Sequence, residues 1–323
     1  MKKIIAILTM MCICVLCAGT VMAADTSYLA FTGDQHGETE TYAEWIDAVK
    51  AAYDLELLSY SGDICDKNWE EDVYNEWAAI LEDKMPGSYN VTTGNQEFKS
   101  GAPGNDWDSL GEGYTRIGEV VRTDDYIVYD LGAGCEDLQI SAEDVEILAE
   151  YFNDVPDDIP IFVLAHYPLH LAVEDEDHEI PGPSDHRQQE GNDGILEILN
   201  EHANVIFLWG HNHTFQDPRY GTILTAGDSF TYDYDNMTDL MTINFTYANY
   251  GSFCRTDTYG ILAGVTRDDD GVSVDLFFVD TDVPDAGCDS AVWHVDADGN
   301  VTCSVTAGTD IDWEAIESMS GVK

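Results

Sequence analysis

Five short polar motifs, each directly after an apolar, β-rich run, constrain this chain more than any other feature of its sequence. Two of them, Gly33-Asp34-Gln35-His36 and Gly210-His211-Asn212-His213, place possible metal ligands at positions i and i+2. Side chains at i and i+2 of an extended backbone point to the same side, so each pair can face one site from the end of a strand. Between them lie three further motifs: Gly62-Asp63-Ile64-Cys65-Asp66, Gly94-Asn95-Gln96-Glu97 and Ala165-His166-Tyr167-Pro168. Such a mixture of Asp, Asn and His at successive strand ends is typical of a hydrolytic centre with two metal ions.

In their order along the chain, D-x-H, G-D-x-x-D, G-N-x-E, H-x-P and G-H-x-H, these motifs resemble those of the calcineurin-like metallophosphoesterases. The resemblance extends from residue 27 to about residue 279. It implies two packed mixed β-sheets flanked by helices, the four-layer sandwich of that family. The residues indicate the same class independently, because strands alternating with helices favour an α/β fold and late hairpins favour a mixed sheet.

Carried over motif by motif, the resemblance implies that Asp63 bridges two transition-metal ions, which the nitrogen-rich, thiolate-free ligand set suggests are iron, manganese or zinc. The other implied ligands form two sets of three: Asp34, His36 and His213 at one ion, and Asn95, His166 and His211 at the other. A water bridging the ions would be deprotonated near neutral pH and attack phosphorus in line, with no covalent enzyme intermediate. The predicted activity is hydrolysis of a small phosphomonoester or phosphodiester. The predicted catalytic residues are Asp63, Asn95, Gln96 and Asp66.

Position 96 departs from the family pattern, which is usually G-N-H-E. The family histidine is credited with helping the leaving group depart or with holding the phosphate. Gln96 can donate a hydrogen bond but cannot supply a proton, and loss of a general acid typically costs about 10²–10⁴-fold in rate. Either another group replaces it, or the substrate has a good leaving group, or activity is weak. The rival hypothesis is therefore a catalytically weak or inactive metal-binding surface protein of the same fold.

The long segment of residues 169–194 leaves directly from a motif-bearing strand end. A loop of this length in a compact domain is either functional or disordered, and we expect a wall or lid over the metals. It carries the candidates for substrate binding, His170, His186 and Arg187, for which an ordinary loop role is an equal alternative. Asp66 is expected either to orient a ligand or Gln96 from behind or to lie on the surface.

Apolar and helical periodicity divides the chain into elements. Strands are predicted at residues 28–32, 55–60, 89–93, 125–131, 159–164, 205–209 and 221–226. Helices are predicted at residues 41–53, 68–81, 141–152 and 194–202, and hairpins at 260–279 and 291–305. We assign residues 24–282 to the catalytic domain and residues 283–323 to a small C-terminal extension, which either packs on that domain or stands apart.

The formal net charge of −50 disfavours nucleic acid and anionic membranes as partners, because such a surface repels polyanions. The expected partner is a small phosphorylated substrate. Lys2 and Lys3 precede an uncharged, mostly apolar run, and Val21 and Ala23 fit cleavage after Ala23. Residues 1–23 therefore read as a secretory signal peptide, which predicts a secreted or extracytoplasmic protein. An uncleaved membrane anchor is the alternative, and no later segment has the length and hydropathy of a membrane span.

Cleavage would leave an odd number of cysteines: Cys65, Cys135, Cys254, Cys288 and Cys303. In an oxidising compartment at most two disulfides can form among them. Cys288 and Cys303 both lie in the C-terminal extension and are the expected pair.

Overall fold

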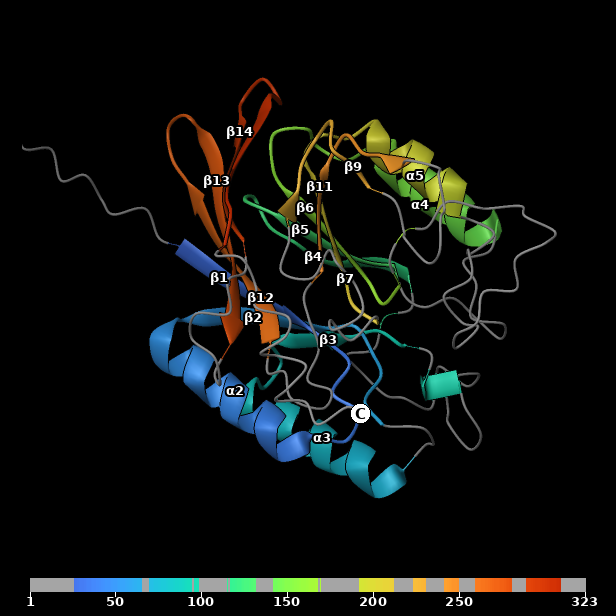
Figure 1. Cartoon of the computed structure of the whole chain (residues 1–323), viewed down its shortest axis with the longest axis vertical. Helices are drawn as coiled ribbons and strands as arrows, with labels where there is room; N and C mark the ends of the chain where they lie inside the picture. The colour runs from blue at the N-terminus through green and yellow to red at the C-terminus, as the bar shows by residue number, and fades with distance from the viewer. Residues whose placement is uncertain are drawn as a thin grey trace, which may run out of the picture.

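The computed structural model describes residues 26–65, 70–94, 96–98, 115, 117–131, 142–167, 169, 192–211, 223–230, 241–249, 259–280 and 289–308. In this part of the chain two β-sheets pack against each other, and each sheet carries helices on its outer face (Figure 1). This is the predicted arrangement of two mixed sheets flanked by helices.

The first sheet has seven strands in the order β15-β14-β13-β12-β1-β2-β3. Its three motif-bearing strands are β1 (Thr26–Thr32), β2 (Leu55–Tyr60) and β3 (Tyr89–Val91), which run parallel to one another. The other four follow in antiparallel pairs: β12 (Tyr259–Arg267), β13 (Gly271–Asp280), β14 (Ser290–Asp296) and β15 (Val301–Thr306). Helices α2 (Thr39–Ala52) and α3 (Glu71–Lys84) cover this sheet (Figure 1).

The second sheet has six strands in the order β4-β5-β6-β7-β11-β8. Its parallel centre consists of β5 (Ile127–Leu131), β6 (Ile161–Ala165), β7 (Val205–Trp209) and β11 (Thr246–Asn249). Antiparallel edge strands β4 (Ile117–Arg122) and β8 (Ile223–Leu224) make the sheet mixed. Helices α4 (Ala142–Phe152) and α5 (Asn192–Asn200) lie on its outer face (Figure 1). A short pair, β9 (Ser229–Phe230) and β10 (Met241–Thr242), stands apart from both sheets.

The main hydrophobic core lies between the two sheets. Every residue of β6 and β7 is buried, as expected of parallel strands covered on both faces. Phe31 of the first sheet stacks on Phe162 of the second with ring centroids 5.2 Å apart. A second cluster joins the first sheet to its helices, where α2 buries Tyr42, Trp45, Ile46 and Val49 at helical spacing.

The parallel strands determine where the motifs lie. Carboxyl ends of neighbouring parallel strands meet at one edge of a sheet, which is where α/β proteins place their ligands. The loops after β1, β2 and β3 therefore come together on the first sheet, and those after β6 and β7 on the second.

The structure confirms the predicted strands at residues 55–60 and 205–209 to the residue. Strands β4 and β11 were not predicted, and the expected strand at 221–226 contracts to the two residues of β8. The C-terminal hairpin of β14 and β15 pairs with β13 and continues the first sheet, which decides between the two arrangements left open by the sequence.

The structure bears only partly on the predicted signal peptide and the predicted disulfide. Residues 1–23 lie outside the described residues, and none of the described helices is long and apolar enough to cross a membrane. Cys65 and Cys303 carry free thiols. The free thiol of Cys303 contradicts its predicted pairing with Cys288, which itself lies outside the described residues.

Candidate metal centre

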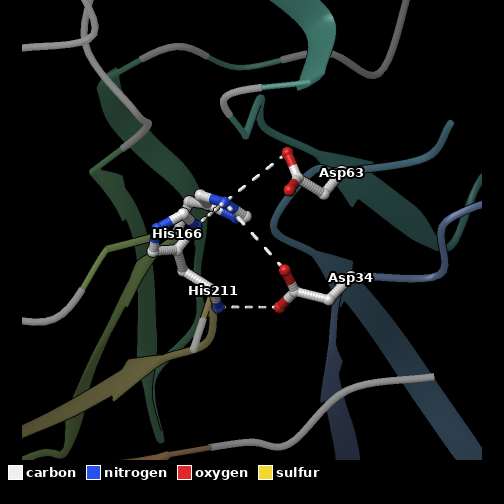
Figure 2. Close-up of side chains that lie close together, drawn as sticks. All are labelled: Asp34, Asp63, His166 and His211. Atoms are coloured by element: carbon white, nitrogen blue, oxygen red, sulfur yellow. Dashed lines mark hydrogen bonds and ion pairs between the residues drawn. The ribbon is translucent and has the colours of Figure 1, made fainter. Parts of the chain in front are cut away.

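Four of the predicted ligands lie together at the edge where the two sheets meet. Asp34 follows β1, Asp63 follows β2, His166 follows β6 and His211 follows β7. Each offers one ligand atom, and these atoms all lie within 4.8 Å of one another (Figure 2). The carboxylates come from the first sheet and the imidazoles from the second, so the cluster depends on how the two sheets are placed.

The backbone at these residues is unusual. Asp34, His36, Asp63 and His211 have φ angles of 56°, 50°, 59° and 71°, and they are the non-glycine residues of the described chain with positive φ. This left-handed conformation costs an L-residue roughly 1–2 kcal/mol, and such strain clusters at functional sites where the surroundings enforce it. Here the loops after β1 and β2 hold each other in this conformation through backbone hydrogen bonds. Asp34 N–H donates to Gly62 O at 2.9 Å, and His36 N–H donates to Asp63 O at 3.0 Å.

The side-chain contacts draw the cluster tightly together. The Nε2 atom of His166 lies 3.5 Å from Asp63 Oδ1 and 4.0 Å from Asp34 Oδ1, and it lies 3.1 Å from Nδ1 of His211. His211 N–H donates to Asp34 Oδ2 at 2.8 Å (Figure 2). His36 also contacts both carboxylates, with Nε2 3.6 Å from Asp63 Oδ2 and 3.8 Å from Asp34 Oδ1. The structure thus brings five predicted ligands to one place, and their role as ligands stays a prediction.

The tautomer of His166 is fixed from behind. Its Nδ1 lies 2.9 Å from the carbonyl oxygen of Ser61, and because a carbonyl can only accept, Nδ1 carries the hydrogen. The lone pair of the neutral ring is then on Nε2, the atom that faces Asp63 and Asp34. Metal-binding histidines are oriented in the same way by a partner on their second nitrogen.

The electrostatics of the cluster call for a cation. Burial lowers the pKa of His166, but the attraction of the Asp63 and Asp34 carboxylates outweighs it and raises the pKa to about 9. Both carboxylates are buried, and Glu97 adds a third beside them. Buried charges are stable only when paired or bound to a metal. Carboxylate oxygens and imidazole nitrogens are suitable ligands for manganese, iron or zinc, so the residues present fit a transition-metal ion.

Glu97 is a residue whose role the sequence reasoning missed. Its buried carboxylate accepts hydrogen bonds from the backbone N–H groups of Asp63, Ile64 and Gly94 at 2.8, 2.9 and 2.8 Å. Burial, and then the neighbouring Asp63, raise its pKa, whereas the three N–H groups lower it. Glu97 therefore ties the loop after β2 to the loop after β3. The signal was present as the last letter of the G-N-x-E motif.

Gln35 has a similar tying role that was also missed. With its amide oriented to satisfy both ends, the oxygen accepts from the N–H groups of Glu38 and Thr39 at 2.6 and 2.7 Å, and the nitrogen donates to Ile64 O at 3.1 Å. The Gln35 side chain thus caps the start of α2 and joins the first loop to the second. No pattern in the sequence pointed to this residue.

Gln96 lies beside the predicted bridging carboxylate, in the short 3₁₀ helix η1 (Gln96–Phe98). Its backbone N–H donates to Asp63 Oδ1 at 2.7 Å. The side chain is 8% exposed, and its buried Oε1 has no hydrogen-bond partner among the described residues. The position that departs from the family pattern is therefore adjacent to the cluster, with an unsatisfied amide oxygen.

Glycines in the motifs let the loops approach closely. A Cβ on Gly62 would lie 1.7 Å from the nitrogen of Gly94. A Cβ on Gly94 would lie 2.2 Å from Asp63 Oδ1 and 2.6 Å from Cε1 of His166. No side chain fits at either position, so these glycines are requirements of the site's geometry.

The remaining predicted site residues lie outside the described part of the chain: Asn95, Asp66, His213, His170, His186 and Arg187. One neighbour not predicted there is Tyr167, whose ring packs edge-on against His211 with centroids 4.4 Å apart. It also contacts His166 at 5.0 Å, so its bulk limits the movement of both imidazoles.

The fold and the cluster define a class: two-sheet α/β proteins that carry carboxylate and imidazole side chains at the strand ends. The family model described as calcineurin-like phosphoesterase matches residues 28–215, more than half of the chain. The chain belongs to the calcineurin-like phosphoesterase family, which depends on two metal ions.

Solved structures with a similar fold include the protein TT1561 of Thermus thermophilus, at 10% identity and a TM-score of 0.42, covering 87% of this chain and 99% of that one. A novel phosphatase from Mycoplasma pneumoniae is 9% identical, with 90% and 97% covered and a TM-score of 0.37. YfcE, a phosphoesterase from E. coli, is 11% identical, with 87% and 100% covered and a TM-score of 0.30. With TM-scores this low they add nothing to the family match. No curated protein matches the sequence.

Proposed function

We propose that this protein is a metal-dependent phosphoric ester hydrolase that acts on a small phosphomonoester or phosphodiester after export from the cell. The observation that carries the proposal is the convergence of Asp34, Asp63, His166 and His211 within 4.8 Å, in a chain of the calcineurin-like phosphoesterase family. The export part rests on residues 1–23 alone, whose charge and hydropathy pattern is that of a signal peptide.

The residues of the cluster would bind two metal ions. Asp63, central among the ligands, would be shared between two ions, with Asp34 and His36 on one side and His166 and His211 on the other. When bound, the ions supply an activated water and positive charge for the phosphoryl oxygens. Ser61 keeps the His166 ring in the tautomer that can ligate. Glu97 holds the two loops that carry Asp63 and Gln96 at a fixed separation.

Gln96 would bind the substrate without giving it a proton. Its amide nitrogen can donate to a phosphoryl oxygen, but an amide is no general acid. Departure of the leaving group would then depend on the group's own acidity. The proposed substrates are accordingly esters of acidic alcohols or phenols.

The test is a substrate panel on the exported form, residues 24–323, loaded with manganese, iron or zinc. We expect hydrolysis of aryl phosphate mono- or diesters that is lost on chelation and restored by metal. The Asp63→Asn variant should lose both activity and bound metal, because the shared carboxylate is gone. Asp269→Asn, in an exposed hairpin turn, serves as the charge-matched control and should behave as wild type. A fully metallated protein that hydrolyses neither class of ester contradicts the proposal.

A second candidate function, a metal-binding surface protein without turnover, is favoured by one observation. Gln96 stands beside Asp63 where the family has a histidine, so the usual proton donor is missing. Bound metal measured alongside turnover separates the candidates. Two ions per chain with no hydrolysis of any ester would establish the second.

A further inference from the structure

A buried polar chain crosses from one sheet to the other beneath the metal centre. Ser59 of β2 donates through Oγ to Asn90 Oδ1 at 2.5 Å. Asn90 of β3 donates through Nδ2 to Asp130 Oδ2 of β5 at 2.6 Å. All three side chains are buried, at 0%, 3% and 0% exposure. The second Asp130 oxygen, Oδ1, has no hydrogen-bond partner among the described residues.

This series of hydrogen bonds lies close to the metal centre on both sheets. Ser59 is in register with Asn90 in the first sheet, and it precedes by two residues Ser61, whose carbonyl orients His166. Asp130 is in register with Leu164 of β6 in the second sheet, two residues before His166. The Asn90–Asp130 hydrogen bond therefore joins the two sheets one layer beneath the ligands.

The core contacts beside it are apolar, and the neighbouring buried hydrogen bonds between the sheets, His166 to Ser61 and His211 to Asp34, involve the ligands themselves. Val128, which shares the face of β5 that carries Asp130, is buried in the main core. Apolar contact is non-directional, and cores tolerate changes of packing when volume is kept. A buried hydrogen bond is directional, and leaving its groups unpaired is costly. Another link between the sheets, from Tyr126 Oη to Glu56 Oε1 at 3.0 Å, is part-buried and lies at the other end of β2.

The stability of the fold does not require this arrangement. Replacing a buried polar set by apolar side chains of similar volume is often neutral or stabilising. Burial raises the pKa of Asp130 well above its ordinary value, and the hydrogen bond from Asn90 opposes this rise only in part. A buried acid at this place is therefore better explained by geometry than by stability.

We propose that Asp130 is a positioning residue whose hydrogen bond with Asn90 fixes how the two sheets lie against each other. In this way it sets the separation of the two carboxylates, Asp34 and Asp63, from the two imidazoles, His166 and His211. The inference rests on the proposed metal site. In the described part of the chain the Asp130 side chain is hydrogen-bonded to Asn90 and to none of the ligands, and it acts through the placement of β5 and β6 against β2 and β3.

The experiment compares three variants in the metal-free full chain. Asp130→Asn keeps an acceptor oxygen for Asn90. The double variant Asn90→Leu with Asp130→Leu, made in a Ser59→Ala background so that no buried hydroxyl loses its acceptor, removes the link while filling the space. Val128→Ala, on the same strand, removes core volume without touching the link. Manganese affinity and stoichiometry are measured by calorimetry, thermal unfolding is followed in parallel, and crystal structures are determined without metal.

We expect Asp130→Asn to bind manganese as wild type does. The double variant should bind about tenfold or more weakly although it unfolds at the same or a higher temperature, and its Asp63–His166 separation should exceed the 3.5 Å seen here. Val128→Ala should unfold at a lower temperature with unchanged affinity, because its effect is on stability alone. If the double variant does not fold, Asn90→Val provides the same test by removing both side-chain hydrogen bonds of Asn90.

Wild-type affinity in the double variant, or an unmoved Asp63–His166 pair in its metal-free structure, overturns the positioning role. An equal loss of affinity in Val128→Ala does so too, since general destabilisation would then account for the effect. A wild-type protein that takes up no manganese, iron or zinc refutes the proposed function instead. In that case the metal-free crystal structures still decide whether Asp130 sets how the two sheets lie against each other.

Discussion

Two kinds of residue make up the metal cluster: the side chains that face one another, and side chains such as Glu97 that hold the loops through their backbone groups. Asp34, Asp63, His166 and His211 were found because five motifs in one order carry more information than any one of them, and the structure brings these four together. Glu97 and Gln35 went unassigned because their partners are backbone groups, some in their own loop and some in a distant one. A side chain that binds backbone leaves no complementary residue in the sequence from which its role could be inferred.

The residue that most affects chemistry is Gln96. The Gln96→His variant should raise the turnover of alkyl phosphates more than that of aryl phosphates, because only poor leaving groups need a proton from the enzyme. A general acid typically contributes about 10²–10⁴-fold, which is the range expected for the alkyl substrates. Steady-state kinetics on a matched alkyl and aryl pair measure the ratio. An equal change for both substrates would remove the leaving-group explanation.

At the scale of elements, long apolar runs were predictable and short irregular strands were not. β7 is a continuous apolar strand and β2 is mostly apolar, and both were placed to the residue. β11 has only four residues, Thr-Tyr-Ala-Asn, too few to establish a period of two. β4 is an edge strand that contains a glycine, a glutamate and an arginine, so its sequence resembles a loop. Both strands exist because their neighbours offer free hydrogen-bonding edges, which sequence periodicity does not report.

The close approach of the loops at the strand ends can be tested by adding a Cβ at Gly94. Gly94→Ala should weaken metal binding about 10–100-fold, because the added Cβ would lie 2.2 Å from Asp63 Oδ1 and displace that carboxylate. Gly87→Ala is the control: its φ is positive, at 69°, unlike that of Gly94, but a Cβ there would meet open space among the described residues. That variant should lose roughly 1–2 kcal/mol of stability and keep its metal affinity. Calorimetric titration of both checks this, and equal affinities would contradict the crowding argument.

At the scale of the whole molecule, the fold class followed from the motifs, whereas the sheet order did not. Strand β1 lies between β12 and β2, and its pairing with β12 joins residues more than 200 positions apart. Such pairings depend on packing over the whole chain, and local patterns do not encode them. The C-terminal hairpin illustrates this, since its sequence predicted two strands but not their attachment to β13.

The net charge of −50 makes a prediction about the entire surface. Like charges repel one another in the folded state and salt screens them. The melting temperature at pH 7 should therefore rise by about 5 °C between 10 mM and 500 mM sodium chloride. The same titration near the isoelectric point of about 4.1 is the control and should give a much smaller rise. Equal rises at both pH values would show that salt acts by another route.

We expect two metal ions to lie between the sheets and to share Asp63. Anomalous diffraction from crystals grown with manganese tests it most directly, because it locates the ions without reference to activity. We expect two anomalous peaks, both in contact with Asp63. One should lie beside Asp34 and His36, and the other beside His166 and His211. A manganese-saturated crystal with no anomalous peak among these side chains would contradict it.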